Sequence, residues 1–145
     1  MRAKGFTLIE LLVVLAILAV IMAVVLPFIG GGGRVQLQRA SNEIAAGLRE
    51  ARSRAIRDGK TAIFVVDGER GVFGILAGDT RLSQVPAGFH LGLLARDQDT
   101  LEPGRGIIRF FADGSSTGGV VGVVRGEGHE NVAIDWLTGR VAITE

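Results

Sequence analysis

The pattern of apolar and polar positions changes twice along the chain. From Phe6 to Ile29 nearly every residue is apolar, and only Thr7 and Glu10 are clearly polar. A helix over this stretch would be roughly 36 Å long, enough to cross a hydrocarbon core of about 30 Å. The pattern therefore predicts a hydrophobic, membrane-spanning stem helix over residues 6–29.

Two basic residues, Arg2 and Lys4, precede the apolar run. Because basic flanks stay on the cytoplasmic side, we expect a cytoplasmic N-terminus and an exported remainder. An ordinary secretory signal fits less well, since its apolar core has only about 7–15 residues and ends in a small-residue cleavage site. Here the run is longer and "FIGGGGR" ends it.

A proline and four glycines follow the apolar run. Pro27 lacks a backbone donor and clashes with the preceding turn, so it is expected to kink or end the helix. The glycines are Gly30, Gly31, Gly32 and Gly33. Together they oppose helix by roughly 4 kcal/mol relative to alanine. We therefore expect a joint over residues 30–33, between the stem and a folded head.

Helical spacing resumes over residues 34–60. Apolar residues that step by three or four form one stripe: Leu37, Ala40, Ile44, Leu48, Ala51 and Ala55. Charged residues fill the other side, where Glu50 lies one turn before Arg54 and is expected to pair with it. Gly59 is expected to cap the end. The pattern predicts an amphipathic helix that packs against a sheet.

From residue 61 onward, short apolar runs alternate with turn residues. The runs at 61–66, 71–76, 88–94, 106–111, 119–124, 131–136 and 140–144 predict strands. Turn residues at 67–71, 112–119 and 137–140 predict hairpins. One helix before many short strands predicts an α+β fold with an antiparallel head over residues 61–145, possibly two-layered. Trp136 is expected to anchor its core.

Charge and cysteine content narrow the function classes. The formal net charge is +1. Residues 34–60 carry seven bases and three acids, whereas residues 61–145 carry seven bases and eleven acids. No strongly basic domain is present, so a general nucleic-acid binder is not indicated. The chain has no cysteine, which excludes disulfides, thiolate catalysis and cysteine-based metal sites.

Some residue types of a hydrolytic triad occur in the head, namely Ser115 or Ser116, His129 and Asp135. However, "GSSTG" lacks the G-x-S-x-G elbow between a strand and a helix, so a triad is not predicted. Neither His129 nor His90 has a neighbouring ligand that would indicate zinc. His90 alternates with apolar residues and is expected to face solvent.

An acidic loop could offer oxygen ligands to Ca²⁺ through Asp97, Asp99 and Glu102. The loop lacks the full EF-hand pattern, and a solvated acidic loop is the favoured interpretation. We therefore predict no catalytic residue, no metal site and no cofactor.

The stretch "KGFTLIELLVVLAIL" (residues 4–18) resembles the class III signal of type IV pilins and type II secretion pseudopilins. The matching features are a basic leader over residues 1–5, Gly5 before the cut, Phe6 as the new N-terminus, and Glu10. The resemblance implies that a prepilin peptidase cleaves between Gly5 and Phe6 and N-methylates Phe6. It also implies that Glu10 pairs with the Phe6 amine of an adjacent subunit in a filament.

Three further stretches resemble H-type minor pseudopilins and the related FimT/FimU minor pilins. They are "LREARSRAIRDGK" (48–60), "IIRFFADGSSTGGVV" (107–121) and "VAIDWLTGRVAI" (132–143). The resemblance implies a pilin-like fold. Arg54 departs from the family pattern, because an acidic residue is common at its position.

The resemblance implies a non-enzymatic minor pseudopilin in the bacterial inner membrane, with a periplasmic head that joins a pseudopilus. Its implied partners are the major pseudopilin, other minor pseudopilins, the prepilin peptidase/N-methyltransferase and the inner-membrane assembly platform, but not nucleic acid. Two alternatives stay open. One is a FimT/FimU-like minor pilin of a type IV pilus that contacts DNA through exposed arginines, and the other is a membrane-anchored periplasmic enzyme.

Overall fold

The computed structural model describes residues 8–29, 32–76, 82–95, 100–102 and 104–144, and for residues 23–29, 95 and 100–102 it describes the backbone alone. The chain divides into two compact units, Met1–Gly33 and Arg34–Glu145. Each unit is described by itself.

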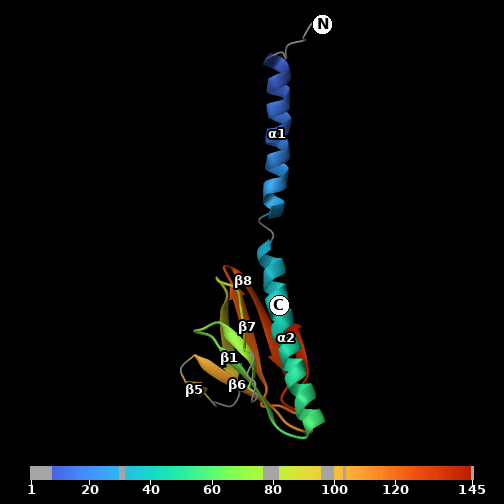
Figure 1. The fold of residues 1–145 in the computed structure, drawn as a ribbon, viewed down its shortest axis with the longest axis vertical. Coiled ribbons are helices and arrows are strands. Elements are labelled where there is room, and N and C mark those ends of the chain that lie inside the picture. Colours follow the sequence, from blue (N-terminus) through green and yellow to red (C-terminus); the bar gives the residue numbers. More distant parts are fainter. Residues whose placement is uncertain (1–7, 30–31, 77–81, 96–99, 103, 145) are drawn as a thin grey trace. The chain divides into compact units, whose positions relative to one another are not determined.

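Most described residues of the first unit form the helix α1 (Leu8–Ile29) (Figure 1). All side chains over residues 8–22 are exposed. The helix continues through Pro27, so the proline does not end it. A proline removes the single hydrogen bond that its own nitrogen would donate, and a long helix can continue across that loss.

Across the described residues, no helix is both long enough and apolar enough to span a membrane. The predicted stem over residues 6–29 reaches beyond the positions whose side chains are described. Its membrane-spanning role stays a prediction.

Helix α2 (Gly32–Asp58) starts with two residues of the glycine run, and the second unit begins within this helix, at Arg34. Gly32 and Gly33 are therefore helical, although we expected a joint there, and Gly30 and Gly31 lie outside the described residues. Glycine is tolerated near a helix N-terminus, and the longer helix that follows adds one hydrogen bond for each residue it extends.

Helix α2 is amphipathic, as predicted. Its buried residues are Leu37, Ala40, Ser41, Ile44, Ala45, Leu48, Ala51 and Ala55, which include the whole predicted stripe. On the opposite side, Arg54 Nε donates to Glu50 Oε1 at 2.8 Å, which confirms the predicted pair. The helix ends at Asp58, Gly59 has a φ of +61°, and Lys60 N donates to Ala55 O at 3.2 Å. This is the Schellman pattern of a glycine cap, as expected.

The described part of the head contains nine strands. They are β1 (Ala62–Asp67), β2 (Val72–Leu76), β3 (Leu82–Gln84), β4 (His90–Ala95), β5 (Thr100–Glu102), β6 (Arg105–Phe110), β7 (Gly119–Arg125), β8 (Gly128–Ile134) and β9 (Val141–Thr144). One sheet has the order β3-β2-β1-β6-β5 and the other has the order β4-β7-β8-β9. All the pairs are antiparallel, which confirms the predicted α+β fold with an antiparallel head.

Two of the three predicted hairpins are present, β1–β2 and β8–β9. The third, over residues 112–119, is wrong because it leads from β6 in one sheet to β7 in the other. The chain does reverse there, and Phe110 pairs briefly with Ser116. Gly118 and Gly119 then adopt φ values of +72° and +147°, which few other residues could adopt, and the chain continues into the second sheet.

Helix α2 and both sheets contribute to the core of the head, and most strands lie on one side of the helix in Figure 1. The first sheet contributes Phe64 and Phe110, both fully buried, and the second contributes Val121 and Val132. Trp136 does not anchor this core, because its side chain is 52% exposed. Strand β8 ends before it, so the in-and-out alternation of the strand no longer places it inside.

Candidate functional site

The predicted assembly site lies at the start of α1. Gly5 and Phe6 are outside the described residues, whereas Glu10 lies in the first turn of the helix with its side chain exposed. A carboxylate in a first turn is stabilised by the helix dipole, typically by about 0.3–1 kcal/mol.

The surface around Glu10 is apolar on every side. Leu8, Ile9, Leu11 and Leu12 are all more than half exposed, and apolar side chains continue around the helix to residue 22. Glu10 is the single charged residue in the α1 sequence. An exposed apolar surface of this size marks a contact with lipid or protein. A carboxylate inside a covered apolar surface is stabilised by a nearby positive charge, because burying a charge is costly unless it is paired.

The head does not bring the hydrolytic residue types together. Ser116 is buried, and its Oγ donates to Asp135 O at 3.0 Å and accepts from Gly118 N at 3.1 Å. Ser115 Oγ donates to Asp113 Oδ1 at 2.6 Å. His129 is exposed near the start of β8, roughly 20 Å along the strand from Asp135. Both serines serve turn structure.

The described residues contain no group of three His, Asp or Glu side chains that could hold a metal ion. Asp97 and Asp99 and the side chain of Glu102 lie outside the described residues, so calcium binding by that loop is not tested. His90 is exposed, as predicted.

Three carboxyl groups, one on α2 and two in the head, have lowered pKa values. The Arg54 hydrogen bond lowers the pKa of Glu50, the Ser115 hydroxyl lowers that of Asp113, and the Thr138 hydroxyl lowers that of Asp135. Each cause is a local hydrogen bond to the ionised form. These hydrogen bonds stabilise the Glu50–Arg54 pair on α2 and two turns. A lowered pKa also makes a carboxylate a weaker base near neutral pH.

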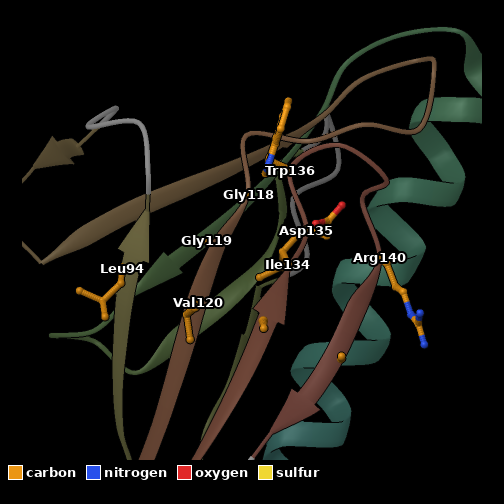
Figure 2. A pocket seen from close by; sticks show the side chains of 10 residues that line it. Leu94, Gly118, Gly119, Val120, Ile134, Asp135, Trp136 and Arg140 are labelled. Carbon is orange, nitrogen blue, oxygen red and sulfur yellow. The ribbon is translucent and has the colours of Figure 1, made fainter.

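Sequence reasoning missed two neighbouring grooves beside the β8–β9 turn. The first, which we call the basic groove, has a volume of about 740 Å³ and is lined by Arg49, Arg52 and Arg140 among others. The second, the apolar groove, has a volume of about 670 Å³ and includes Leu94 and Trp136 (Figure 2). Arg140 lines both grooves.

Arginine abundance in α2 was the one sequence signal for the basic groove. It could not show that Arg140, far along the chain, lies next to Arg49 and Arg52. That neighbourhood depends on how the β8–β9 turn lies against the helix.

Together, the fold and the candidate site define a class. An apolar N-terminal helix with one acidic residue in its first turn precedes a helix that packs on antiparallel sheets. This is the organisation of pilin-like subunits.

Solved structures support the same fold. The minor pseudopilin EpsH from the type 2 secretion system of Vibrio cholerae matches with a TM-score of 0.60 at 10% identity, over 75% of this chain and 96% of that one. The type IV minor pilin FimU of Pseudomonas aeruginosa matches with a TM-score of 0.56 at 18% identity, over 77% of this chain and 90% of that one.

The sequence itself identifies the family. Residues 1–26 match the prokaryotic N-terminal methylation motif, and residues 40–138 match the family of type II transport protein GspH. The type II secretion system protein H of Xanthomonas campestris pv. campestris is 30% identical over 141 residues, which cover 97% of this chain and 82% of that protein. The chain belongs to the GspH family.

Family membership confirms the predicted H-type pseudopilin of type II secretion, and the type IV minor pilin is not favoured. It also implies other pseudopilins as partners. The family is one of structural subunits. With its methylation motif, the chain has the features of a membrane-anchored periplasmic protein.

Proposed function

We propose that this chain is a non-catalytic minor subunit of the pseudopilus that supports protein secretion across the outer membrane. It is anchored in the bacterial inner membrane by one pass, with a cytoplasmic N-terminus and a periplasmic head. The observation that carries the proposal is Glu10, the single charge on an otherwise apolar helix that matches a methylation motif.

The N-terminus is processed before assembly. Prepilin peptidase cleaves between Gly5 and Phe6, removes the basic leader, and N-methylates the new Phe6 amine. The match of residues 1–26 to the methylation motif supports this step. Cleavage leaves a positive charge four residues before Glu10 on each mature chain.

Assembly brings that charge to Glu10 of a neighbouring subunit. A lone carboxylate at the centre of a spanning helix costs about 2.5–3.5 kcal/mol, and less near the interface. When apolar helices pack together, losing one member of a buried charge pair costs about 3–5 kcal/mol. The Glu10–amine contact therefore sets the register between neighbours, and the inner-membrane platform and major pseudopilin complete the assembly.

The test is Glu10→Ala in the full chain. We expect a folded, processed and membrane-inserted protein whose amount in the sheared pseudopilus fraction falls at least about tenfold, because the neighbour's Phe6 amine loses its counter-charge. Quantitative immunoblotting measures incorporation. Intact mass shows whether residues 1–5 have been lost and one methyl group gained.

Glu43→Ala is the matched control, since it removes the same charge from the exposed side of α2. It should assemble normally. Normal co-assembly of the Glu10→Ala protein would refute the register role, and a mature protein that keeps residues 1–5 would refute the processing.

A further inference from the structure

The basic groove holds three arginines, Arg49, Arg52 and Arg140. Arg49 and Arg52 lie on α2, and Arg140 lies directly before β9. None of them forms an ion pair with a carboxylate among the described residues. By contrast, Arg54 and Arg57, on another side of the same helix, both approach Glu50.

The carboxylate that lines the groove, Asp135, has one oxygen engaged in its own turn. Thr138 donates to Asp135 Oδ1 twice, from its backbone nitrogen and from its hydroxyl, each at 2.7 Å. Asp135 therefore closes its own turn. The groove keeps an excess of positive charge.

Two of the arginines are held in place by backbone carbonyls. Arg52 Nε donates to Gly114 O at 3.0 Å, and Arg49 Nη2 donates to Val141 O at 3.3 Å. A guanidinium has five N–H donors, so each bond leaves most of the donors for another acceptor. A charged group that is fixed before binding loses less conformational entropy when a ligand arrives.

Glycines make room for Arg52. A Cβ atom added at Gly139 would lie 2.8 Å from Arg52 Nε, and one added at Gly114 would lie 3.2 Å from Arg52 Nη2. Both glycines have positive φ, at +62° and +86°. Two turns from separate parts of the head thus close around one guanidinium, which fixes its position at the groove.

The apolar groove adjoins this cluster through Arg140. Its apolar members include Leu94, which is 78% exposed, and Trp136, with Val120 on the sheet surface between them (Figure 2). A free phosphate has no apolar part to place there. A protein segment with an acidic side chain beside an apolar one can occupy both grooves.

We propose that the basic groove binds a carboxylate-bearing segment of a partner subunit, with an apolar side chain of that segment in the apolar groove. The carboxylates accept from the free N–H groups of Arg49, Arg52 and Arg140, and Trp136 covers the apolar side chain. That the partner is another pseudopilin rests on the proposed function, whereas the chemistry of the site does not.

The experiment uses the full chain in detergent micelles and the fluorescence of Trp136, the single tryptophan. The ligands are a capped hexapeptide of alternating glutamate and leucine, the same peptide with glutamine, an oligo-dT strand and inorganic phosphate. We expect saturable binding of the glutamate peptide at least about tenfold tighter than that of the other three. The glutamine peptide lacks the charge that strengthens hydrogen bonds to arginine. Oligo-dT and phosphate carry charge but have no aliphatic side chain to place in the apolar groove.

Arg140→Met decides the residue assignment, because its side chain makes no hydrogen bond to the described residues and its loss leaves the turns intact. We expect about tenfold weaker binding of the glutamate peptide. Arg52→Met should weaken binding as well. Arg54→Met, an arginine already paired with Glu50, is the control and should bind as the unmodified chain does.

Equal binding of the glutamine peptide, tighter binding of oligo-dT or phosphate, or unchanged binding by Arg140→Met would each overturn the proposal. The assay needs no filament, so its outcome is separate from pseudopilus incorporation. Suppose that the chain binds the glutamate peptide, but that the Glu10→Ala variant still assembles normally. The groove proposal would then stand, and the proposed assembly mechanism would be refuted.

Discussion

Gly139 shows how a single residue can hold the head's turns together. It has a φ of +62°, and an added Cβ would collide with Gly114 O and approach Arg52 Nε. We expect Gly139→Ala to lower the free energy of unfolding by about 2–4 kcal/mol, since backbone strain of about 1–3 kcal/mol is joined by the collision. Urea unfolding of the full chain measures the change.

Gly126→Ala separates the two causes. Gly126 has a nearly equal φ of +58°, but an added Cβ there would meet no atom within 4 Å. The Gly126→Ala variant therefore has the backbone strain alone, and its free energy of unfolding should fall less than that of Gly139→Ala. Equal losses for the two variants would show that the close approach at Gly139 contributes nothing.

Asp135 gives a pH-dependent prediction at the same scale. Its folded pKa is lowered, chiefly by the Thr138 hydroxyl, so its stabilising contribution is present above the unfolded value of about 3.9 and is lost as pH falls through the lower folded pKa. Thr138→Val removes the hydroxyl, and we expect the pKa of Asp135 to rise toward its ordinary value.

Carbon-detected NMR of the side-chain carboxyl groups follows this titration. Asp113 serves as the internal control, because Ser115 lowers its pKa in a separate turn. An unchanged pKa of Asp135 in the variant, or an equal rise at Asp113, would contradict the assignment.

Residue contacts could be predicted from the sequence where they were local. The Glu50–Arg54 pair follows from a spacing of four on a helix, and the structure confirms it. Trp136 was misplaced because hydrophobicity alone does not show where a strand ends. Arg140 was not linked to Arg52, since no local pattern reports a contact between distant parts of the chain.

At the scale of elements, Leu48 connects α2 to the core. Its side chain is fully buried among residues of both the helix and the sheets. We expect Leu48→Ala to lower the free energy of unfolding by about 2–5 kcal/mol, through lost apolar burial and the cavity left behind. Chemical denaturation followed by circular dichroism measures it.

Val35→Ala is the control on the same helix, because half of the Val35 side chain is already exposed. A surface substitution of this kind should change stability by at most about 0.5 kcal/mol. A loss at Leu48 no larger than that at Val35 would mean that α2 does not depend on its buried stripe.

Periodicity predicted the elements that are long enough to show a period. The stripe of α2 and the longer strands were recognised, whereas β3 and β5, with three residues each, carry too little alternation to be seen. Turn residues at 112–119 correctly indicated a reversal. They could not indicate that the next strand joins the other sheet, because strand partners are set by long-range packing.

At the scale of the whole molecule, the second unit has its own core. Every residue of the buried cluster lies between Leu37 and Val141. We expect residues 34–145 alone to unfold in one cooperative transition, with a midpoint close to that of the head in the full chain. Coincident urea curves from circular dichroism and Trp136 fluorescence would show this.

The Leu48→Ala version of the same fragment is the control, and its midpoint should fall. A fragment that stays unfolded, or that melts without cooperativity, would mean that residues 1–33 are required for the head to fold. The family assignment would be unaffected, because the match to the GspH family begins at residue 40.

The evenness of α1 leads to one last consequence. A helix that is apolar around its whole circumference gives its neighbours no preferred rotation and no preferred axial position. Many packing arrangements would therefore have nearly the same energy. Glu10 is the one charged residue of α1 and distinguishes one side of the helix from the others. Moving the acid by one position turns it through about 100° around the helix axis. Under the proposed assembly mechanism, this would rotate each subunit while leaving the hydrophobicity of the helix unchanged.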